Sequence, residues 1–302
     1  MSSERCEVLE RRTDKLREIR LHDPKAIREA ARRRRRRPLI GDDGCLFLVA
    51  ADHPARGALG VGGRAMAMAD RDDLLERLCV ALSRPSVDGV LATPDIIEDL
   101  VLLGVLENKV AIGSMNRGGL SGAVFELDDR FTAYDVLRII DFGLDGGKML
   151  CRIAPDNPAT AATLESCARA VTALAENQLM AMIEPFWASS ASGITRNDLS
   201  TEMVIRSVTV TSALGATSAF TWLKLPVVPE MERVVAATTL PVLVLGGDPA
   251  PGGMDTLSTL EAALCLPGVR GLAAGRALLY PADEDVAGAI DQMAAALGRT
   301  TR

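Results

Sequence analysis

A lysine at the end of a short apolar segment is the residue of this chain best suited to chemistry. In the segment Phe220-Thr221-Trp222-Leu223-Lys224, β-strand alternation places Lys224 on the same face as the two aromatic rings. Burial beside such rings disfavours an ammonium and lowers its pKa, and a neutral amine is a nucleophile toward carbonyl compounds. We therefore predict Schiff-base chemistry at Lys224. The alternative is a lysine at a strand end whose amine extends to water.

A second lysine is expected to assist this amine. Lys148 also lies on a predicted strand, and its positive charge would lower the pKa of Lys224 further if both point into one space. The alternative for Lys148 is a structural salt bridge, to Asp52 or to Asp145.

Glu184 is the predicted acid–base group. It shares a strand face with Met180 and Met182, and a carboxyl group among thioethers is expected to have a raised pKa. The alternative is an ion pair that only neutralises a buried lysine.

Further polar residues follow other predicted strands. Asp52 is expected to orient substrate hydroxyls or a lysine, whereas alternation sends His53 away from the interior, where it would be a packing histidine. Ser114 and Arg152 are predicted to contribute to binding of the substrate or its phosphate.

Two glycine-containing strand ends suit an anion. Gly246 and Gly247 let backbone N–H groups approach a phosphate closely, and the step from Gly275 to Arg276 begins a predicted helical turn. Either pair could also serve only the geometry of a turn. Their joint position after the last two predicted strands favours a phosphate site.

The elements that must position these residues alternate regularly. Apolar strand segments are predicted at residues 45–50, 89–93, 110–114, 148–153, 179–184, 219–224, 241–247 and 271–275. Amphipathic helices are predicted at residues 70–83, 94–104, 133–140, 158–176, 199–213, 228–236, 254–266 and 283–297. Eight such units predict an α/β fold, a (β/α)8 TIM barrel, in which the active site lies at the C-terminal ends of the strands. An open doubly wound sheet is disfavoured, because no GxGxxG motif follows the first strand.

The first 40 residues differ from the rest of the chain. They are polar, with a predicted helix that starts at Asp23-Pro24 and ends in the run Arg32–Arg37, which Pro38 stops. We expect an arginine-rich helical extension at residues 1–40 and a catalytic barrel at residues 41–302. The run could bind RNA or phosphate, but a solvated helix face or an oligomer contact is more usual.

Composition narrows the function classes. The chain has 302 residues and a formal charge of −6, which argues against a general affinity for nucleic acid or anionic membranes. No apolar run is long enough to span a bilayer, and the charged N-terminus does not resemble a signal peptide, so a cytoplasmic protein is expected. Two histidines and six scattered cysteines predict neither zinc nor disulfides, although an oxygen-rich magnesium site stays open.

Three C-terminal segments resemble a known family. AFTWLKLP, PVLVLGGDP and GVRGLAAGRALLYP are similar to the last three strands of class I aldolases of the deoxyribose-phosphate, tagatose-bisphosphate and archaeal-type fructose-bisphosphate group. AADHPARG, GGKMLCRI and LMAMIEP resemble their strand-one Asp-His-Gly, strand-four lysine and strand-five glutamate segments. The resemblance implies a Schiff base at Lys224, phosphate binding by the Gly-Gly and Gly-Arg pairs, no cofactor, and a lyase that commonly forms homo-oligomers.

The whole chain also resembles a bacterial family of deoxyribose-phosphate-aldolase-like barrels tied to inositol breakdown. RRRRRPLIG, AADHPARGALGVG, IGSMNRGGL and FELDDRFTAYD carry this likeness. It implies cleavage of 2-deoxy-5-keto-gluconate 6-phosphate to dihydroxyacetone phosphate and malonate semialdehyde. The alternatives are another ketose-phosphate aldolase, a non-covalent barrel isomerase or decarboxylase, and a ligand-binding barrel.

Two departures from the family pattern concern the site. Pro54 stands where the family has glycine after the histidine. The archaeal-type enzymes use a tyrosine near strand four as proton donor, whereas Tyr134 and Tyr280 are the only tyrosines here. The resemblance therefore implies that Glu184 or a water molecule takes that role.

Overall fold

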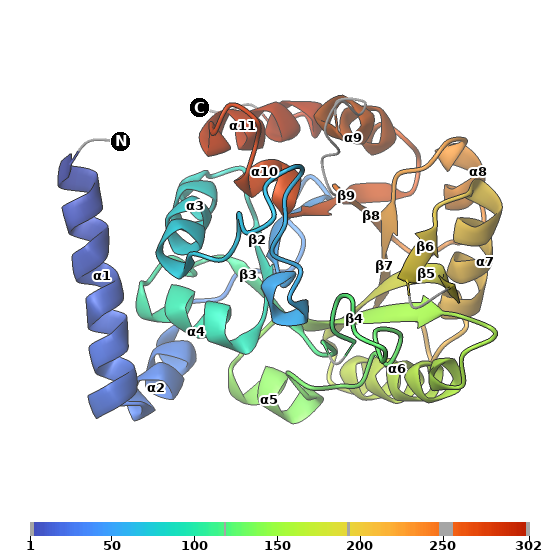
Figure 1. The fold of residues 1–302 in the computed structure, drawn as a ribbon, viewed down its shortest axis with the longest axis horizontal. Coiled ribbons are helices and arrows are strands. Elements are labelled where there is room, and N and C mark those ends of the chain that lie inside the picture. The colour runs from blue at the N-terminus through green and yellow to red at the C-terminus, as the bar shows by residue number, and fades with distance from the viewer. Residues whose placement is uncertain (1–2, 118, 192–193, 248–255, 300–302) are drawn as a thin grey trace.

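Eight parallel strands close into a barrel in the computed structural model, which describes residues 3–117, 119–191, 194–247 and 256–299. β1 pairs with both β2 and β9, and β4 pairs with β5, so the ring of strands is complete. This confirms the predicted (β/α)8 fold (Figure 1). The barrel strands are β1 (Leu46–Ala51), β2 (Gly89–Ala92), β3 (Val110–Ser114), β4 (Gly146–Ile153), β5 (Met180–Ala191), β7 (Thr221–Pro226), β8 (Val242–Leu245) and β9 (Val269–Ala274).

Helices follow the strands and surround the barrel (Figure 1). They are α3 (Arg71–Ser83), α4 (Pro94–Leu102), α5 (Val136–Asp141), α6 (Ala159–Glu176), α7 (Thr201–Ser212), α8 (Met231–Val235), α9 (Thr256–Leu264), α10 (Arg276–Leu279) and α11 (Val286–Ala296). Aspartates cap three of them: Asp70, Asp135 and Asp285 each accept hydrogen bonds from backbone N–H groups of the first turn. The first residues of the helix predicted at 254–266 lie outside the described residues.

The barrel interior has an apolar layer below a charged layer. Residues two apart on a strand share a face, so the strands present alternate residues inward. The apolar layer consists of Leu46, Leu48, Ala50, Leu91, Val110, Ile112, Met180, Met182, Leu243 and Ala273. The same alternation carries Lys148, Glu184 and Lys224 inward toward the C-terminal ends of their strands. A larger apolar cluster packs outside this ring, against the helices.

A hairpin beyond the barrel was not predicted. β5 continues past the expected end at Glu184, and β6 (Ile194–Asp198) pairs with it in antiparallel fashion, with Trp187 opposite Asp198. The continuation begins with Pro185, where we expected the strand to end, and β6 is mostly polar, with the sequence Ile-Thr-Arg-Asn-Asp.

The arginine run binds the barrel itself. α1 (Ser3–His22) packs against α3, and α2 (Lys25–Arg33) packs against α4. The predicted helix ends before Arg34, whose backbone has left the helical region. Four arginines reach carboxylates of the barrel: Arg34 and Arg36 pair with Asp145, Arg35 with Glu107, and Arg37 with Asp88. Arg32 and Arg33, the two members of the run on α2, stay largely exposed, as expected for a solvated helix face.

The carboxylates that receive these arginines also hold strand backbones. Asp145 Oδ2 accepts the N–H of Ala111 at 2.8 Å, and Asp88 Oδ2 accepts the N–H of Phe47 at 2.7 Å. Both aspartates precede strands, so they lie at the N-terminal end of the barrel, opposite the predicted site.

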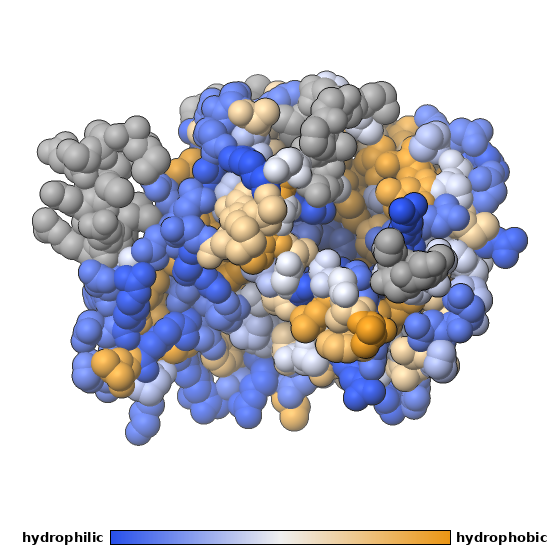
Figure 2. Space-filling view, viewed as in Figure 1, coloured by the Kyte–Doolittle hydropathy of each residue, from blue (hydrophilic) through white to orange (hydrophobic). Residues whose placement is uncertain are grey.

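The surface of the protein is mainly hydrophilic on the face that Figure 2 shows, with apolar patches between the hydrophilic residues. Within the described ranges, no helix has both the length and the apolar character needed to cross a membrane.

The buried pair between the extension and the barrel should contribute measurably to stability. We expect Asp145→Asn to lower the free energy of unfolding by about 3 kcal/mol, because it leaves the buried Arg34 guanidinium without its carboxylate. Urea denaturation followed by circular dichroism would measure this change. The control is Asp14→Asn, which removes an exposed pair with Arg17 and should leave the free energy of unfolding nearly unchanged. Equal effects of the two substitutions would contradict a structural role for the arginine run.

Candidate active site

A cavity opens at the C-terminal ends of the barrel strands. Its volume is about 360 Å³, within the range of small-molecule sites. Its polar and charged lining comes from several different strands and loops, as in barrel enzymes generally. The lining of the cavity includes His53, Arg56, Arg117, Glu184, Asn197, Leu199, Lys224, Gly246, Gly247, Gly275 and Arg276.

Lys224 reaches the cavity from the inward face of β7. The residue is 2% exposed, and its Nζ donates a hydrogen bond to Glu184 Oε1 at 2.8 Å. Burial lowers the pKa of the Lys224 amine; Glu184 opposes this shift, and the charges of Arg117 and Arg276 reinforce it. The structure thus places this lysine on the inward face of its strand, where the sequence predicted it, with a lowered pKa.

Lys148 is buried beneath Lys224 and does not line the cavity. Its Nζ bonds to Asp52 Oδ2 at 3.0 Å and pairs with Glu184 Oε2. Burial, together with the charge of Arg117, holds its pKa well below the ordinary lysine value. The salt bridge to Asp52 that we considered is therefore present, and one to Asp145 is not made, since that residue lies at the opposite end of the barrel. Of the two amines, Lys224 is the one a ligand can touch.

Glu184 is a carboxylate shared by two lysines. Burial alone would raise its pKa, but the charges of Lys148, Lys224 and Arg117 outweigh burial and hold the pKa well below its usual value. The expectation of a raised pKa was therefore wrong. Methionines on the same strand do not decide the protonation state of this group, because cations from neighbouring strands lie closer to its oxygens.

Two arginines of the site were missed. Arg117 forms an ion pair with Asp52 Oδ2, and burial lowers its pKa to about 10. Arg56 donates to the carbonyl of Gly119 at 2.8 Å and pairs with Glu126. Both lie in loops after strands β1 and β3, where no periodicity indicates which way a side chain points.

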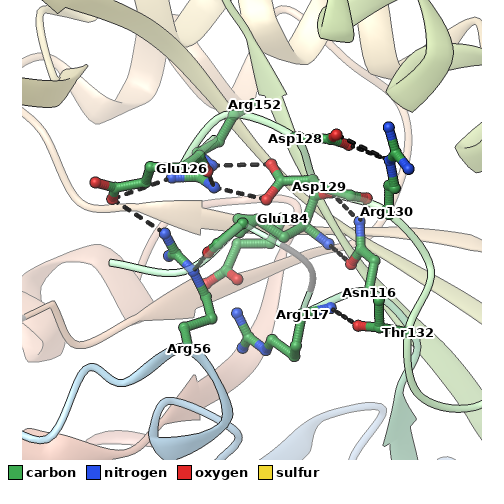
Figure 3. Close-up of polar contacts among 12 residues, drawn as sticks. Arg56, Asn116, Arg117, Glu126, Asp128, Asp129, Arg130, Thr132, Arg152 and Glu184 are labelled. Atoms are coloured by element: carbon green, nitrogen blue, oxygen red, sulfur yellow. Dashed lines mark hydrogen bonds and ion pairs between the residues drawn. The ribbon is translucent and has the colours of Figure 1, made fainter. Parts of the chain in front are cut away.

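Ser114 and Arg152 lie behind the site. Arg152 binds Asp129 through two hydrogen bonds of 2.8 and 2.6 Å and also contacts Glu126 (Figure 3). The hydroxyl of Ser114 donates to Asp52 Oδ2 at 3.3 Å. Neither residue is part of the cavity lining, so the structure gives them supporting positions in place of the direct substrate contact that we expected.

His53 lies in the cavity, contrary to the expectation that it would point away. The regular alternation of β1 ends at Ala51, and the backbone of His53 is helical, with φ −64° and ψ −41°, as it enters the short 3-10 turn Pro54–Arg56. Strand alternation therefore no longer applies to this residue. Burial, with the charges of Arg276 and Lys224, holds the pKa of His53 well below its usual value.

The glycine-containing strand ends meet at one side of the cavity. Gly246, Gly247, Gly275 and Arg276 all line it, as their positions after the last two strands predicted. Gly247 has a left-handed backbone with φ 59°. A Cβ on Gly275 would lie 2.2 Å from the carbonyl oxygen of Ala50, so this glycine is also required for packing against β1. Asp248, which follows the Gly-Gly pair, lies outside the described residues.

A metal site is not evident in the described part of the chain. No group of three or more histidine, cysteine, aspartate or glutamate side chains there is arranged to hold an ion.

Comparison with known proteins identifies the family. A sequence model of the Cgl0159-like family matches residues 44–294, which is most of the chain. The chain belongs to the Cgl0159-like family. A crystal structure of Cgl0159 from Corynebacterium glutamicum is 52% identical in sequence and covers 98% of both chains, with a TM-score of 0.91.

More distant solved structures share the fold of this Cgl0159-like chain. A Schiff-base-forming fructose-1,6-bisphosphate aldolase is 18% identical, covers 90% of this chain and 99% of its own, and has a TM-score of 0.65. A fructose-bisphosphate aldolase from Slackia heliotrinireducens is 17% identical, with coverage of 83% and 86% and a TM-score of 0.58. No protein with a curated description matches the sequence.

The shared carboxylate should control the protonation of Lys224. In Glu184→Gln we expect the pKa of the Lys224 amine to fall further, because the charge that stabilises its ammonium is removed. The rate of cyanate modification at Lys224, followed by peptide mass spectrometry across a pH series, should then reach its midpoint at lower pH. Glu202→Gln, at an exposed pair with Arg233, is the control and should leave the midpoint unchanged. A midpoint that stays in place or rises in Glu184→Gln would show that another group sets the charge of Lys224.

Proposed function

We propose that this protein is a class I aldolase that cleaves a phosphorylated keto-sugar or keto-acid through a Schiff base on Lys224. The observation that carries the proposal is the position of Lys224: its amine is buried, bonded to a carboxylate at 2.8 Å, and reachable from a cavity of about 360 Å³. Such an amine attacks a substrate carbonyl to give a carbinolamine and then an iminium, which withdraws electrons from the adjacent carbon–carbon bond.

Glu184 and Lys148 have defined parts in this scheme. Glu184 Oε1 touches the reacting nitrogen, so it exchanges protons with that nitrogen as the carbinolamine forms and loses water. Lys148 holds the second carboxylate oxygen and is in turn held by Asp52. Asp52 thus positions the amines, and the iminium acts as the electron sink.

The charge of the cavity favours an anionic substrate. Among the described residues that line it, three are arginines and one is a carboxylate, although the whole chain is acidic. The arginines are Arg56, Arg117 and Arg276, and the carboxylate is Glu184. We propose that Gly246, Gly247, Gly275 and Arg276 bind the substrate phosphate, the usual location for phosphate in such barrels.

The comparisons support the same chemistry without extending it to a substrate. One archaeal fructose-1,6-bisphosphate aldolase of the same fold, 18% identical to this chain, is described with its catalytic lysine bound to the carbinolamine of its substrate. For the present protein we propose 2-deoxy-5-keto-gluconate 6-phosphate as the first compound to test, with other ketose phosphates beside it. A cytoplasmic homo-oligomer is part of the same proposal.

Borohydride trapping tests the proposal directly. Reduction in the presence of a panel of keto-sugar phosphates, including dihydroxyacetone phosphate and fructose 1,6-bisphosphate, should add the mass of one substrate fragment to Lys224 and inactivate the protein irreversibly. Lys224→Met should abolish the adduct.

The chain supplies an internal control for this experiment. It contains five lysines, and Lys109 has a pKa lowered to about 8 by burial but lies at the other end of the barrel, against the carbonyls of Arg84 and Val87. Peptide mapping should therefore find Lys224 modified and Lys109 unmodified. An adduct at Lys109, or activity that survives borohydride with substrate present, would favour a non-covalent barrel enzyme.

A further inference from the structure

Cleavage of a carbon–carbon bond needs a group that accepts a proton from a substrate hydroxyl. In the scheme above the amine of Lys224 is bonded to the substrate, and Glu184 serves that nitrogen. The charges of Lys148, Lys224 and Arg117 hold the pKa of Glu184 well below its usual value, which makes it a weak base toward a hydroxyl group. Arginines stay protonated and cannot accept. The hydroxyl proton therefore needs another acceptor.

The tyrosines are poorly placed for this task. Neither Tyr134 nor Tyr280 lines the cavity, and burial raises the pKa of both phenols. Of the described residues in the lining, His53 is the one whose side chain is neutral and carries a nitrogen lone pair that can accept a proton.

The geometry around His53 distinguishes its two ring nitrogens. Nδ1 is buried without a hydrogen-bond partner among the described residues, and it lies 3.8 Å from Asp52 Oδ1, which is also buried and also lacks such a partner. The two atoms are beyond hydrogen-bond distance, but the negative charge of Oδ1 favours the proton of the neutral imidazole on the nitrogen that lies near it. This tautomer leaves the lone pair on Nε2.

The position of the ring also suits a bound substrate. A Cβ on Gly275 would lie 3.4 Å from His53 Cε1, so the imidazole packs next to the backbone of the proposed phosphate site. Arg276 and Lys224 are close enough that their charges act on the ring. His53 is therefore close to the proposed phosphate site at Gly275 and Arg276 and to Lys224, the amine proposed to bond to the carbonyl carbon of the substrate.

We propose that His53 Nε2 is the proton acceptor of the carbon–carbon cleavage step, with Asp52 as its positioning residue. This inference rests on the proposed aldolase function. With the substrate held as an iminium on Lys224, Nε2 takes the proton of the hydroxyl on the carbon that becomes the aldehyde. The O–H electron pair forms the new C=O bond, the carbon–carbon bond breaks, and its electrons move to the iminium to give a neutral enamine. In the condensation direction, the imidazolium returns the proton to the new alkoxide.

Binding of a phosphate would prepare the ring for this step. In the empty cavity the pKa of His53 is held well below its usual value by burial, by Arg276 and by Lys224. A phosphate beside Arg276 offsets the charge of that arginine, so the pKa of His53 rises toward the operating pH, where a general base is most effective.

The test separates Schiff-base formation from cleavage. The panel compound that the wild type cleaves fastest is used for two measurements: the yield of the borohydride adduct on Lys224 and the single-turnover rate of cleavage. In His53→Gln we expect an adduct yield within about twofold of the wild type and a cleavage rate lowered about 10²- to 10⁴-fold, the usual contribution of a general base. His22→Gln, at the other histidine of the chain, which is exposed on α1, should change neither measurement.

A third measurement excludes a purely structural effect. In His53→Ala, added imidazole should restore part of the cleavage rate, because the cavity can admit the missing base.

Three results would overturn the inference. Cleavage by His53→Gln within a few-fold of the wild type would assign the proton transfer to another group. Loss of the adduct together with cleavage, without rescue by imidazole, would make His53 a residue needed to build the site. Failure of the wild type to form any adduct would contradict the proposed function itself, and the role of His53 would fall with it.

Discussion

One buried carboxylate determines the charge state of the whole site. Glu184 bonds Lys224 with one oxygen and Lys148 with the other, so two amines that burial would otherwise neutralise compete for a single negative charge. Asp52 adds a second contact to the deeper lysine and also pairs with Arg117. The deeper lysine, which a ligand cannot reach, contacts two carboxylates, whereas the lysine that faces the cavity contacts one. Burial lowers the pKa of both amines in spite of these contacts.

Strand periodicity was enough to predict the framework and the centre of the site. Apolar runs alternating with amphipathic stretches indicated the barrel, and alternation placed Lys148, Glu184 and Lys224 inward on their strands. Both results follow from local backbone geometry, which sequence spacing records directly. The clustering of Gly246, Gly247, Gly275 and Arg276 followed from the rule that strand ends meet at one face of the barrel.

The errors have two causes. The pKa of Glu184 depends on Lys148, Lys224 and Arg117, and these cations come from other strands and loops. The carboxylates that pair with Arg35, Arg36 and Arg37 likewise lie more than 50 positions along the chain. Sequence spacing cannot show such pairings, since they are made only when the barrel closes. His53 was misplaced for a local reason, because strand periodicity ends at Ala51.

β5 carries Glu184 in the barrel and also forms one strand of the hairpin that borders the cavity. Glu184 lies within the barrel part of β5, and the same strand then leaves the barrel and pairs with β6. Asn197 in β6 and Leu199 just after it line the cavity. Glu184, which bonds to Lys224, is thus held in the closed ring of strands, while Asn197 and Leu199 belong to the hairpin outside the ring. Because β6 is not part of the ring, its length and side chains can diverge between related proteins without disturbing the lysines. The closed ring of strands therefore holds the buried lysines, while a hairpin outside the ring supplies part of the cavity wall.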